Sequence, residues 1–277
     1  MIRIRSCGGF DELDACVRLE IETWGYDASD IIPRKAFVVA QAIGGQVIGA
    51  FDPPITGEED GGGPEPLVGF AMSLPGAKTG QGEPRAYLHS HMLAVREGYR
   101  NRGLGARLKW EQRREALSRG IRHIEWTFDP LEIKNAYLNI HRLGAIVCRY
   151  EENFYGVSSS RLQGGLPTDR LFAEWRLDSP RVQARLEERP AAEFVPCERI
   201  QARIRVPASI NGWKASDRDR ERALAVQLEN RRKFQDAFAR GLVVIGFTRD
   251  PEGNGVFELG DLSAAEEPQT PKGRKTL

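Results

Sequence analysis

The 277-residue sequence lacks the features that mark metal-binding, disulfide-linked or membrane proteins. Its four cysteines are scattered, no C-x-x-C pair occurs, and no histidine stands at the spacing of a zinc ligand. We therefore expect free cytosolic thiols and no metal site. No run of about 18 apolar residues occurs, and the first residues, MIRIRSCGGFDELD, lack the apolar core of a signal peptide. These absences predict a cytoplasmic protein that does not span a membrane.

An excess of charge of either sign is also missing. The chain has 40 Lys and Arg against 39 Asp and Glu, a net charge of +1. It has no overall field to attract nucleic acid or an anionic membrane, and we expect neither partner. The hydrophobic content of 40% is enough for one large core or two modest ones.

Apolar spacing predicts strands alternating with helices, hence an α/β or α+β protein. Phe10, Leu13, Val17, Ile21 and Trp24 recur at helical spacing after the strand-like IRIR. The same reasoning predicts strands at 44–52, 66–74, 87–95, 121–129, 146–156 and 170–177, and helices at 104–120 and 134–145. The glycine-, proline- and acid-rich stretch at 53–66 predicts a long hairpin with a mobile tip.

Composition also predicts the domain boundaries. Residues 179–196 contain prolines and many charges with little apolar periodicity, so we expect a linker there, after a first domain over residues 1–178. Residues 197–262 predict a small β-α-β-β unit with its helix at 217–240, and residues 263–277 a disordered tail. The small unit has little core of its own, so we expect it to dock against the first domain.

The stretch RNRGLG, residues 100–105, joins a predicted strand to a predicted helix. Its glycines permit positive φ and close approach of a ligand, while the N–H groups of residues 101–106 and the positive end of the helix face an anion. Five nearby cations favour a polyphosphate, although some must lie on a solvated helix face: Arg96, Arg100, Arg102, Arg107 and Lys109. The alternative is a tight turn whose glycines serve packing alone. The G-x-G-x-x-G order of a Rossmann site and the G-K-[ST] of a Walker loop are both absent.

From residue 1 to 178 the sequence resembles the GNAT superfamily of acyl-CoA-dependent N-acyltransferases. LAVREGYRNRGLGARL resembles the pyrophosphate-binding motif of that family, and NAYLNIHRLGA its later helix on the pantetheine side. Together with HSHMLAV, WTFDPL and GLPTDRLFAEW, these motifs resemble a poorly characterised prokaryotic branch of predicted acetyltransferases. The resemblance implies a mixed, mostly antiparallel sheet with splayed central strands flanked by helices.

The resemblance also implies acetyl-CoA or another acyl-CoA as co-substrate. The pantetheine arm would lie between the strands of residues 92–95 and 124–128, where a backbone N–H of residues 92–94 polarises the thioester carbonyl. Asn135 would bond the pantetheine amide. The implied cofactor-binding residues are Met92, Leu93, Ala94, Val95, Arg100, Asn101, Arg102, Gly103, Leu104, Gly105, Ala106 and Asn135.

Transfer to an amine needs a base with a pKa near the working pH, which suits histidine. His89 and His91 stand two apart on a predicted strand and share a face. His89 also lies eleven residues before Arg100, where the histone acetyltransferase branch of the family places its glutamate base, so we place it ahead of His91. Either histidine also fits a structural role, as a half-buried side chain bonded to the backbone. His123 reads as a surface residue.

The sequence differs from the family pattern at the residue that would protonate the leaving thiolate. Many members carry a tyrosine four residues before the glycine of the later helix, and here that position is Ile140. Tyr137 and His141 lie within a turn of it and are alternatives, as is solvent. Each also fits a plain helix residue.

Three further residues stand at or near the end of the strand at 121–129. Asp129 fits either a role in orienting substrate or a cap for the following helix. Glu125 and Thr127 alternate with apolar residues and are expected on the acceptor side.

These patterns predict an enzyme that moves an acyl group directly from acyl-CoA to an amine of a small molecule or a protein. One alternative is a non-catalytic acyl-CoA-binding or regulatory module, and another is an interaction domain with a purely structural turn. The C-terminal unit can cover the acceptor site, supply the surface of a homodimer, or complete the fold.

Overall fold

The computed structural model describes residues 1–53, 65–79, 84–189, 195 and 197–263. These residues group into two compact units. Unit 1 comprises Met1–Thr127 and Asn153–Thr168, and unit 2 comprises Phe128–Glu152 and the described residues from Asp169 onward. The expected tip of the hairpin at 53–66 and the expected tail at 263–277 fall almost wholly outside the described residues.

Unit 1 is a sheet with helices on both faces. Its strands, in the order in which they pair, are β1 (Arg3–Ser6), β2 (Gln46–Phe51), β3 (Leu67–Lys78), β4 (Arg85–Val95) and β5 (His123–Phe128). The first four pair antiparallel, and β4 pairs with β5 in parallel. The helical segments are α1 (Gly9–Trp24), α2 (Arg34–Ala42), η1 (Glu97–Tyr99) and α3 (Leu104–Ser118).

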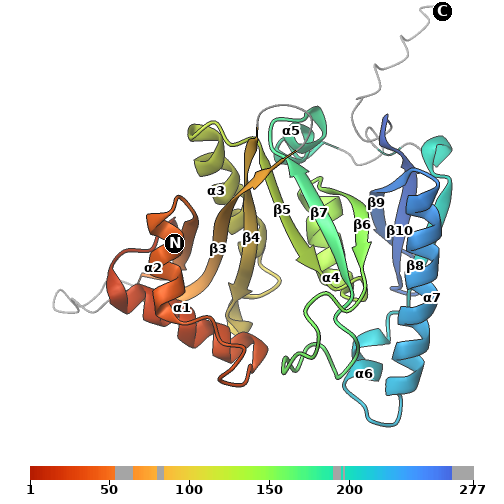
Figure 1. Ribbon diagram of the computed structural model, residues 1–277, viewed down its shortest axis with the longest axis horizontal. Coiled ribbons are helices and arrows are strands. Elements are labelled where there is room, and N and C mark those ends of the chain that lie inside the picture. The colour runs from red at the N-terminus through yellow and green to blue at the C-terminus, as the bar shows by residue number, and fades with distance from the viewer. Residues whose placement is uncertain (54–64, 80–83, 190–194, 196, 264–277) are drawn as a thin grey trace, which may run out of the picture. The chain divides into compact units, whose positions relative to one another are not determined.

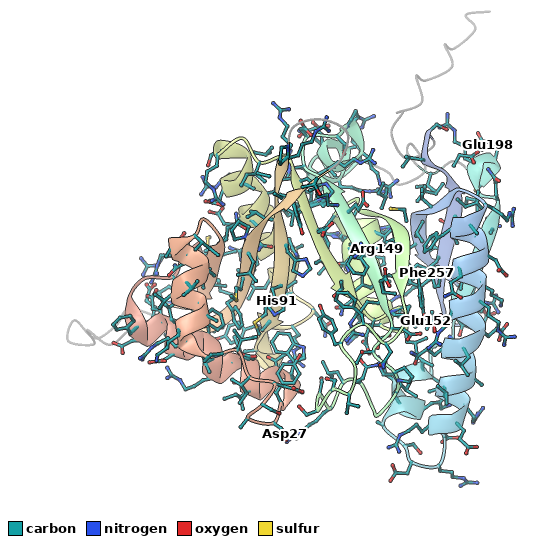
Figure 2. The ribbon with its side chains drawn as sticks, in the orientation of Figure 1. Asp27, His91, Arg149, Glu152, Glu198 and Phe257 are labelled. Atoms are coloured by element: carbon teal, nitrogen blue, oxygen red, sulfur yellow. The ribbon has the colours of Figure 1, made fainter. Side chains whose placement is uncertain are left out.

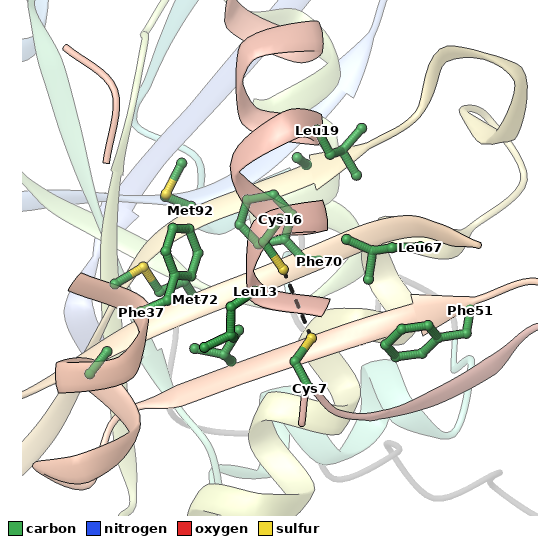
Figure 3. Packing of buried hydrophobic residues seen from close by; sticks show 13 residues of the cluster. Cys7, Leu13, Cys16, Leu19, Phe37, Phe51, Leu67, Phe70, Met72 and Met92 are labelled. Carbon is green, nitrogen blue, oxygen red and sulfur yellow. Dashed lines mark hydrogen bonds between the residues drawn. The ribbon is translucent and has the colours of Figure 1, made fainter. Parts of the chain in front are cut away.

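Alternation along the strands builds a core on each face of this sheet. Val47 and Phe70 pack with α1 and α2, while Ile48 and Ala71, the next residue on each strand, pack with Leu104 and Leu108 of α3. Figure 3 shows the first cluster, in which the thiols of Cys7 and Cys16 lie 3.9 Å apart. Burial of each large apolar side chain contributes about 1.5–3 kcal/mol, which fixes the helices to the sheet.

The crossover that carries the glycine turn is confirmed. β4 leads through η1 and α3 to the parallel strand β5. Their pairing joins Leu88 to Ile124 and His89 to Glu125, and beyond it the two strands diverge (Figure 1). This divergence opens one side of the later part of β4.

The first helix forms as predicted, but its buried face differs from the predicted one. Leu13 is buried, whereas Phe10 and Ile21 are 64% and 42% exposed. The helix buries Cys16, Leu19 and Glu20 instead, so the true face is rotated about the helix axis. Val17 and Trp24 of the predicted face still pack against this core, so apolar spacing found part of the buried face.

Unit 2 contains five further strands, in the order β7-β6-β9-β10-β8, all paired antiparallel. They are β6 (Ile146–Glu151), β7 (Arg170–Arg176), β8 (Ala202–Val206), β9 (Leu242–Arg249) and β10 (Gly255–Asp261). The helical segments are α4 (Ile133–Ala136), the π-helix η2 (Tyr137–Arg142), α5 (Pro180–Leu186), η4 (Cys197–Arg199), α6 (Ile210–Lys214) and α7 (Arg220–Ala239). The expected β-α-β-β order after residue 197 is confirmed, with α6 added.

The units divide the chain differently from the expected boundaries at 178 and 197. The expected linker contains α5, whose Ala184 packs with Ile146 of β6 and with Val243 and Ile245 of β9. Strand β9 also pairs with β6, Val147 opposite Val244. The C-terminal segment therefore shares a sheet and a core with residues 146–176. No helix in the described part of the chain is long and apolar enough to cross a bilayer.

Candidate active site

A β-bulge in β4 places the two histidines of that strand. Met92 pairs with Met72 and Ser90 with Ser73, so His91 is an extra residue without an opposite partner in β3. Ser90 faces α3 and Met92 packs with α1, which shows that the alternation of side chains changes at His91. The rings of His89 and His91 lie 5.9 Å apart, so the expected shared face is confirmed. His91 is labelled in Figure 2.

After the bulge, alternate residues of β4 direct their backbone N–H and C=O groups toward the side on which β5 diverges. The N–H of Arg96 donates to the carbonyl of Val68 in β3 at 2.9 Å. Because alternate residues of a strand direct their N–H and C=O to the same neighbour, Ala94 and Met92 also face β3. Leu93 and Val95 therefore direct their backbone groups away from β3, toward the side on which β5 has diverged. Within the expected stretch at 92–94, this geometry singles out the N–H of Leu93.

The turn between β4 and α3 has the backbone of an anion site. Asn101 and Gly103 have φ of 61° and 76°, and Gly103 is the N-cap of α3 without a side-chain cap bond. A Cβ atom added at Gly103 would meet nothing within 4 Å. The first N–H groups of a helix have no acceptor within it. They therefore face open space together with the positive end of the helix.

The cations around this turn have different roles: the sequence predicts some of them on a solvated helix face, but Lys109 lies in the core. Lys109 is buried, donates to Ser90 Oγ at 2.6 Å and lies 3.8 Å from the centre of the Trp126 ring. Burial lowers its pKa well below the usual value, so it supplies no surface charge. Arg107 donates to the carbonyl of Ile2. Arg100 and Arg102 are exposed, and Arg100 Nε is held by the Val95 carbonyl at 2.8 Å.

His91 has the protonation state that a general base needs. Burial lowers its pKa below the usual 6.5, so its imidazole is neutral at pH 7 and can accept a proton. It lies in the bulge, two residues before Leu93. A neutral imidazole and a backbone N–H that points away from β3 therefore lie on the same short stretch of β4.

The residues expected from the later helix lie in unit 2. Asn135 is exposed on α4, and Ile140 is fully buried in η2. The ring of Tyr137 stacks on that of His141 with centroids 4.5 Å apart. Burial lowers the pKa of His141, and the neighbouring Arg185 and Arg142 lower it further. The structure thus brings Tyr137 and His141 together within unit 2.

Contacts at the end of β5 settle how three polar residues are held. Asp129 accepts from the N–H of Leu131 at 2.8 Å, as a cap does, and from Lys214 Nζ at 2.7 Å. Glu125 is bonded to Lys78 and lies near His123. Burial alone would raise the pKa of Glu125, but the bonds from His123 and Lys78 lower it to about 2. Thr127 Oγ1 lies 2.9 Å from the hydroxyl of Tyr155.

Sequence reasoning missed Glu20, a fully buried acid on α1. Its Oε1 accepts from the N–H of Ile32 at 2.9 Å, while Oε2, like the hydroxyl of Thr23 one turn on, has no hydrogen-bond partner among the described residues. Burial raises the pKa of Glu20 to about 7, partly opposed by the bond from Ile32. The run VRLEIETW holds two acids, Glu20 and the exposed Glu22, and no signal in the sequence distinguished the buried one.

Replacing Glu20 with glutamine is expected to stabilise the protein at high pH. The folded-state pKa of about 7 lies above the ordinary 4.5, so ionisation of Glu20 costs stability progressively as the pH rises between these values. Glu20→Gln keeps the acceptor for Ile32 and should raise the free energy of unfolding by about 1–3 kcal/mol at pH 8. Urea unfolding at pH 5 and pH 8 measures the change, and Glu221→Gln, at an exposed position of α7, is the control. An equal effect at both pH values would contradict the argument.

The described residues contain neither a cluster that could bind a metal nor a disulfide. No cluster of three or more His, Cys, Asp or Glu there could hold a metal ion. None of the four cysteines forms a disulfide: Cys7 and Cys16 are buried, while Cys148 and Cys197 are exposed.

A comparison with known families identifies the region that holds this site. Residues 20–144 match the model of the acetyltransferase (GNAT) family. The match includes β4, the turn, α3 and β5. A search of curated proteins found no significant match.

Three solved structures are similar to part of the chain. NAA60 of Arabidopsis thaliana in complex with acetyl-CoA is 16% identical with a TM-score of 0.49, covering 64% of this chain and 99% of that chain. The ribosomal-protein-S18-alanine N-acetyltransferase of Escherichia coli is 16% identical with a TM-score of 0.45, covering 64% and 94%. The putative acetyltransferase yncA of Salmonella typhimurium with acetyl-CoA is 18% identical with a TM-score of 0.47, covering 64% and 94%.

Proposed function

We propose that this chain, whose residues 20–144 match the model of the acetyltransferase (GNAT) family, transfers the acyl group of an acyl-CoA directly to an amine. Acetyl-CoA is the first candidate for the donor. The observation that carries the proposal is the open, uncapped N-terminus of α3 behind Gly103, beside diverging strands. We also propose that the protein acts in the cytoplasm, as the sequence predicts.

The turn fits the pyrophosphate of an acyl-CoA. The N–H groups of residues 103–106 and the exposed guanidinium groups of Arg100 and Arg102 supply donors and positive charge. A thioester supplies an activated acyl group at the far end of the same molecule. The backbone of Leu93 and Val95 would hold the arm between these two ends, with Asn135 retained as a candidate partner of its amide.

The reaction needs one proton acceptor and one oxyanion donor. The amine nitrogen attacks the thioester carbonyl carbon, and the N–H of Leu93 stabilises the negative charge that develops on the carbonyl oxygen. His91, neutral at pH 7, accepts the proton that the amine loses. The C–S bond then breaks, and the thiolate leaves and takes a proton from solvent, since the tyrosine position of the family is Ile140. Tyr137 remains an alternative donor and His89 an alternative base.

Calorimetric titration with acetyl-CoA and CoA, followed by a transfer assay with a panel of amines, tests the proposal. Micromolar binding and release of CoA that depends on the amine are expected. Because Cys148 and Cys197 are exposed, CoA should be measured by chromatography and not with a thiol reagent. No binding by folded protein would refute the function. Tight binding without transfer to any amine would identify a non-catalytic acyl-CoA-binding module.

A further inference from the structure

Two segments distant in sequence meet at the end of unit 1 where β4 and β5 diverge. They are the connection between α1 and α2, residues 25–33, and the loop at 153–168. The N–H of Asp27 donates to Ser159 Oγ at 3.0 Å, and the N–H of Arg161 donates to the carbonyl of Trp24 at 3.2 Å. Asp27 is labelled in Figure 2.

This pair of segments is tied to the strands that hold the proposed site. The hydroxyl of Tyr155 lies 2.9 Å from Oγ1 of Thr127, which is beyond the last pairing of β5 with β4. Glu22 at the end of α1 pairs with Arg96, the residue after β4, at 3.4 Å. An acceptor that approaches the divergent end therefore passes this surface.

Aromatic side chains lie on both segments, on a surface that we call the aromatic end and define as Trp24, Tyr26, Thr127, Phe154 and Tyr155. The rings of Trp24 and Tyr26 stack with centroids 5.8 Å apart, and those of Phe154 and Tyr155 meet edge to face at 4.7 Å. Phe154 and Tyr155 are 44% and 45% exposed. Folded loops ordinarily bury large apolar side chains. Neighbouring ones that stay exposed are typical of a binding surface.

The charged groups at this end argue against a polycationic ligand. Asp30 accepts from both the N–H and the hydroxyl of Ser159, at 3.0 and 2.6 Å. Glu22 is paired with Arg96, and Glu20 is buried against Ile32. A polyamine needs several carboxylates for its separate charges, and three of those described near this end already bond within the fold, whereas the exposed Asp27 beside them suits a single charge. A single ammonium group, in contrast, can be stabilised by cation–π contact with the aromatic rings.

We propose that the acceptor is a primary monoamine with an aromatic or similarly flat apolar body, which packs against Tyr155 and Phe154. Polyamines and aminoglycosides are then poor acceptors. This inference rests on the proposed acyl transfer. The rings bind the body of the acceptor by edge and face contacts, and its amine reaches the end of β4 where His91 and the N–H of Leu93 lie.

Comparison of three amines tests the substrate class. The ratio kcat/KM for 2-phenylethylamine is expected to exceed those for butylamine and spermidine by more than about tenfold. Tyr155→Ala and Phe154→Ala should each raise the KM for 2-phenylethylamine roughly tenfold, while the affinity for acetyl-CoA stays unchanged. Phe10→Ala, which removes a 64% exposed ring elsewhere on α1, is the matched control. Preference for spermidine, or an unchanged KM in both ring variants, would overturn the proposal.

A binding measurement separates this inference from the proposed function. Saturation-transfer NMR can follow 2-phenylethylamine added to the protein with CoA present, and it requires no turnover. Binding that Tyr155→Ala removes and Tyr155→Phe keeps would support the aromatic end, even if no acyl transfer occurs. Equal signals from the wild type and both alanine variants, or none from the wild type, would refute it.

Discussion

Replacing Gly103 with glutamate is expected to lower the affinity for acetyl-CoA by at least about 100-fold. The new Cβ and carboxylate enter the open space in front of α3, where the pyrophosphate would accept hydrogen bonds from backbone N–H groups. Hydrogen bonds to a charged group contribute about 1.5–3 kcal/mol each, so the loss of two accounts for such a change. Calorimetry with acetyl-CoA measures it directly.

Two other glycines provide matched controls. Gly120 stands just beyond α3 with the same φ of 76° and nothing within 4 Å of an added Cβ. Gly120→Glu therefore introduces the same backbone strain and charge at the opposite end of the helix. Gly98→Glu places a carboxylate in open space within the same connection, five residues earlier. Normal binding of acetyl-CoA by Gly103→Glu, or an equal loss of affinity in all three variants, would contradict the proposal that this turn binds the pyrophosphate.

Replacing His91 with alanine is expected to lower kcat by about 100-fold or more, with little change in the affinity for acetyl-CoA. General-base catalysis contributes about 10²–10⁴ to the rate, and His91 is the half-buried imidazole in the bulge before Leu93. Because burial lowers its pKa, activity in the wild type should fall with decreasing pH only below 6.5. The variant should lose that limb of the pH profile.

His89→Ala is the matched comparison, since its ring lies 5.9 Å from that of His91 on the same face. Steady-state rates from pH 5 to 9, with thermal unfolding of each variant, distinguish catalysis from folding. If His89→Ala removes the acid limb and His91→Ala keeps it, the base is His89, as the resemblance favours.

The sequence placed the glycine turn and its flanking elements because these depend on local patterns. Gly103 and Gly120 stand at the two ends of α3, both with positive φ, and the parallel strands on either side follow from the crossover. Such features depend on which residues permit a given backbone conformation. They can therefore be read from one chain.

Features set by packing between distant segments could not be read in this way. The bulge at His91 depends on the register between β4 and β3, and no residue type marks it. Lys109 looked like a phosphate ligand because it is one turn into a basic helix, yet it points at Ser90 and Trp126 in the core. Glu20 was missed because two apolar arcs of α1 compete, and the sheet buries the one that contains it.

The pairing of β6 with β9 has a consequence for any shortened form of the protein. A chain that stops before residue 197 keeps β6 but loses β9 and with it the partner of Val147. The backbone of β6 would then become a free template onto which a strand from another molecule can add. The segment after residue 197 thus protects the rest of the chain from self-association, whatever else it does.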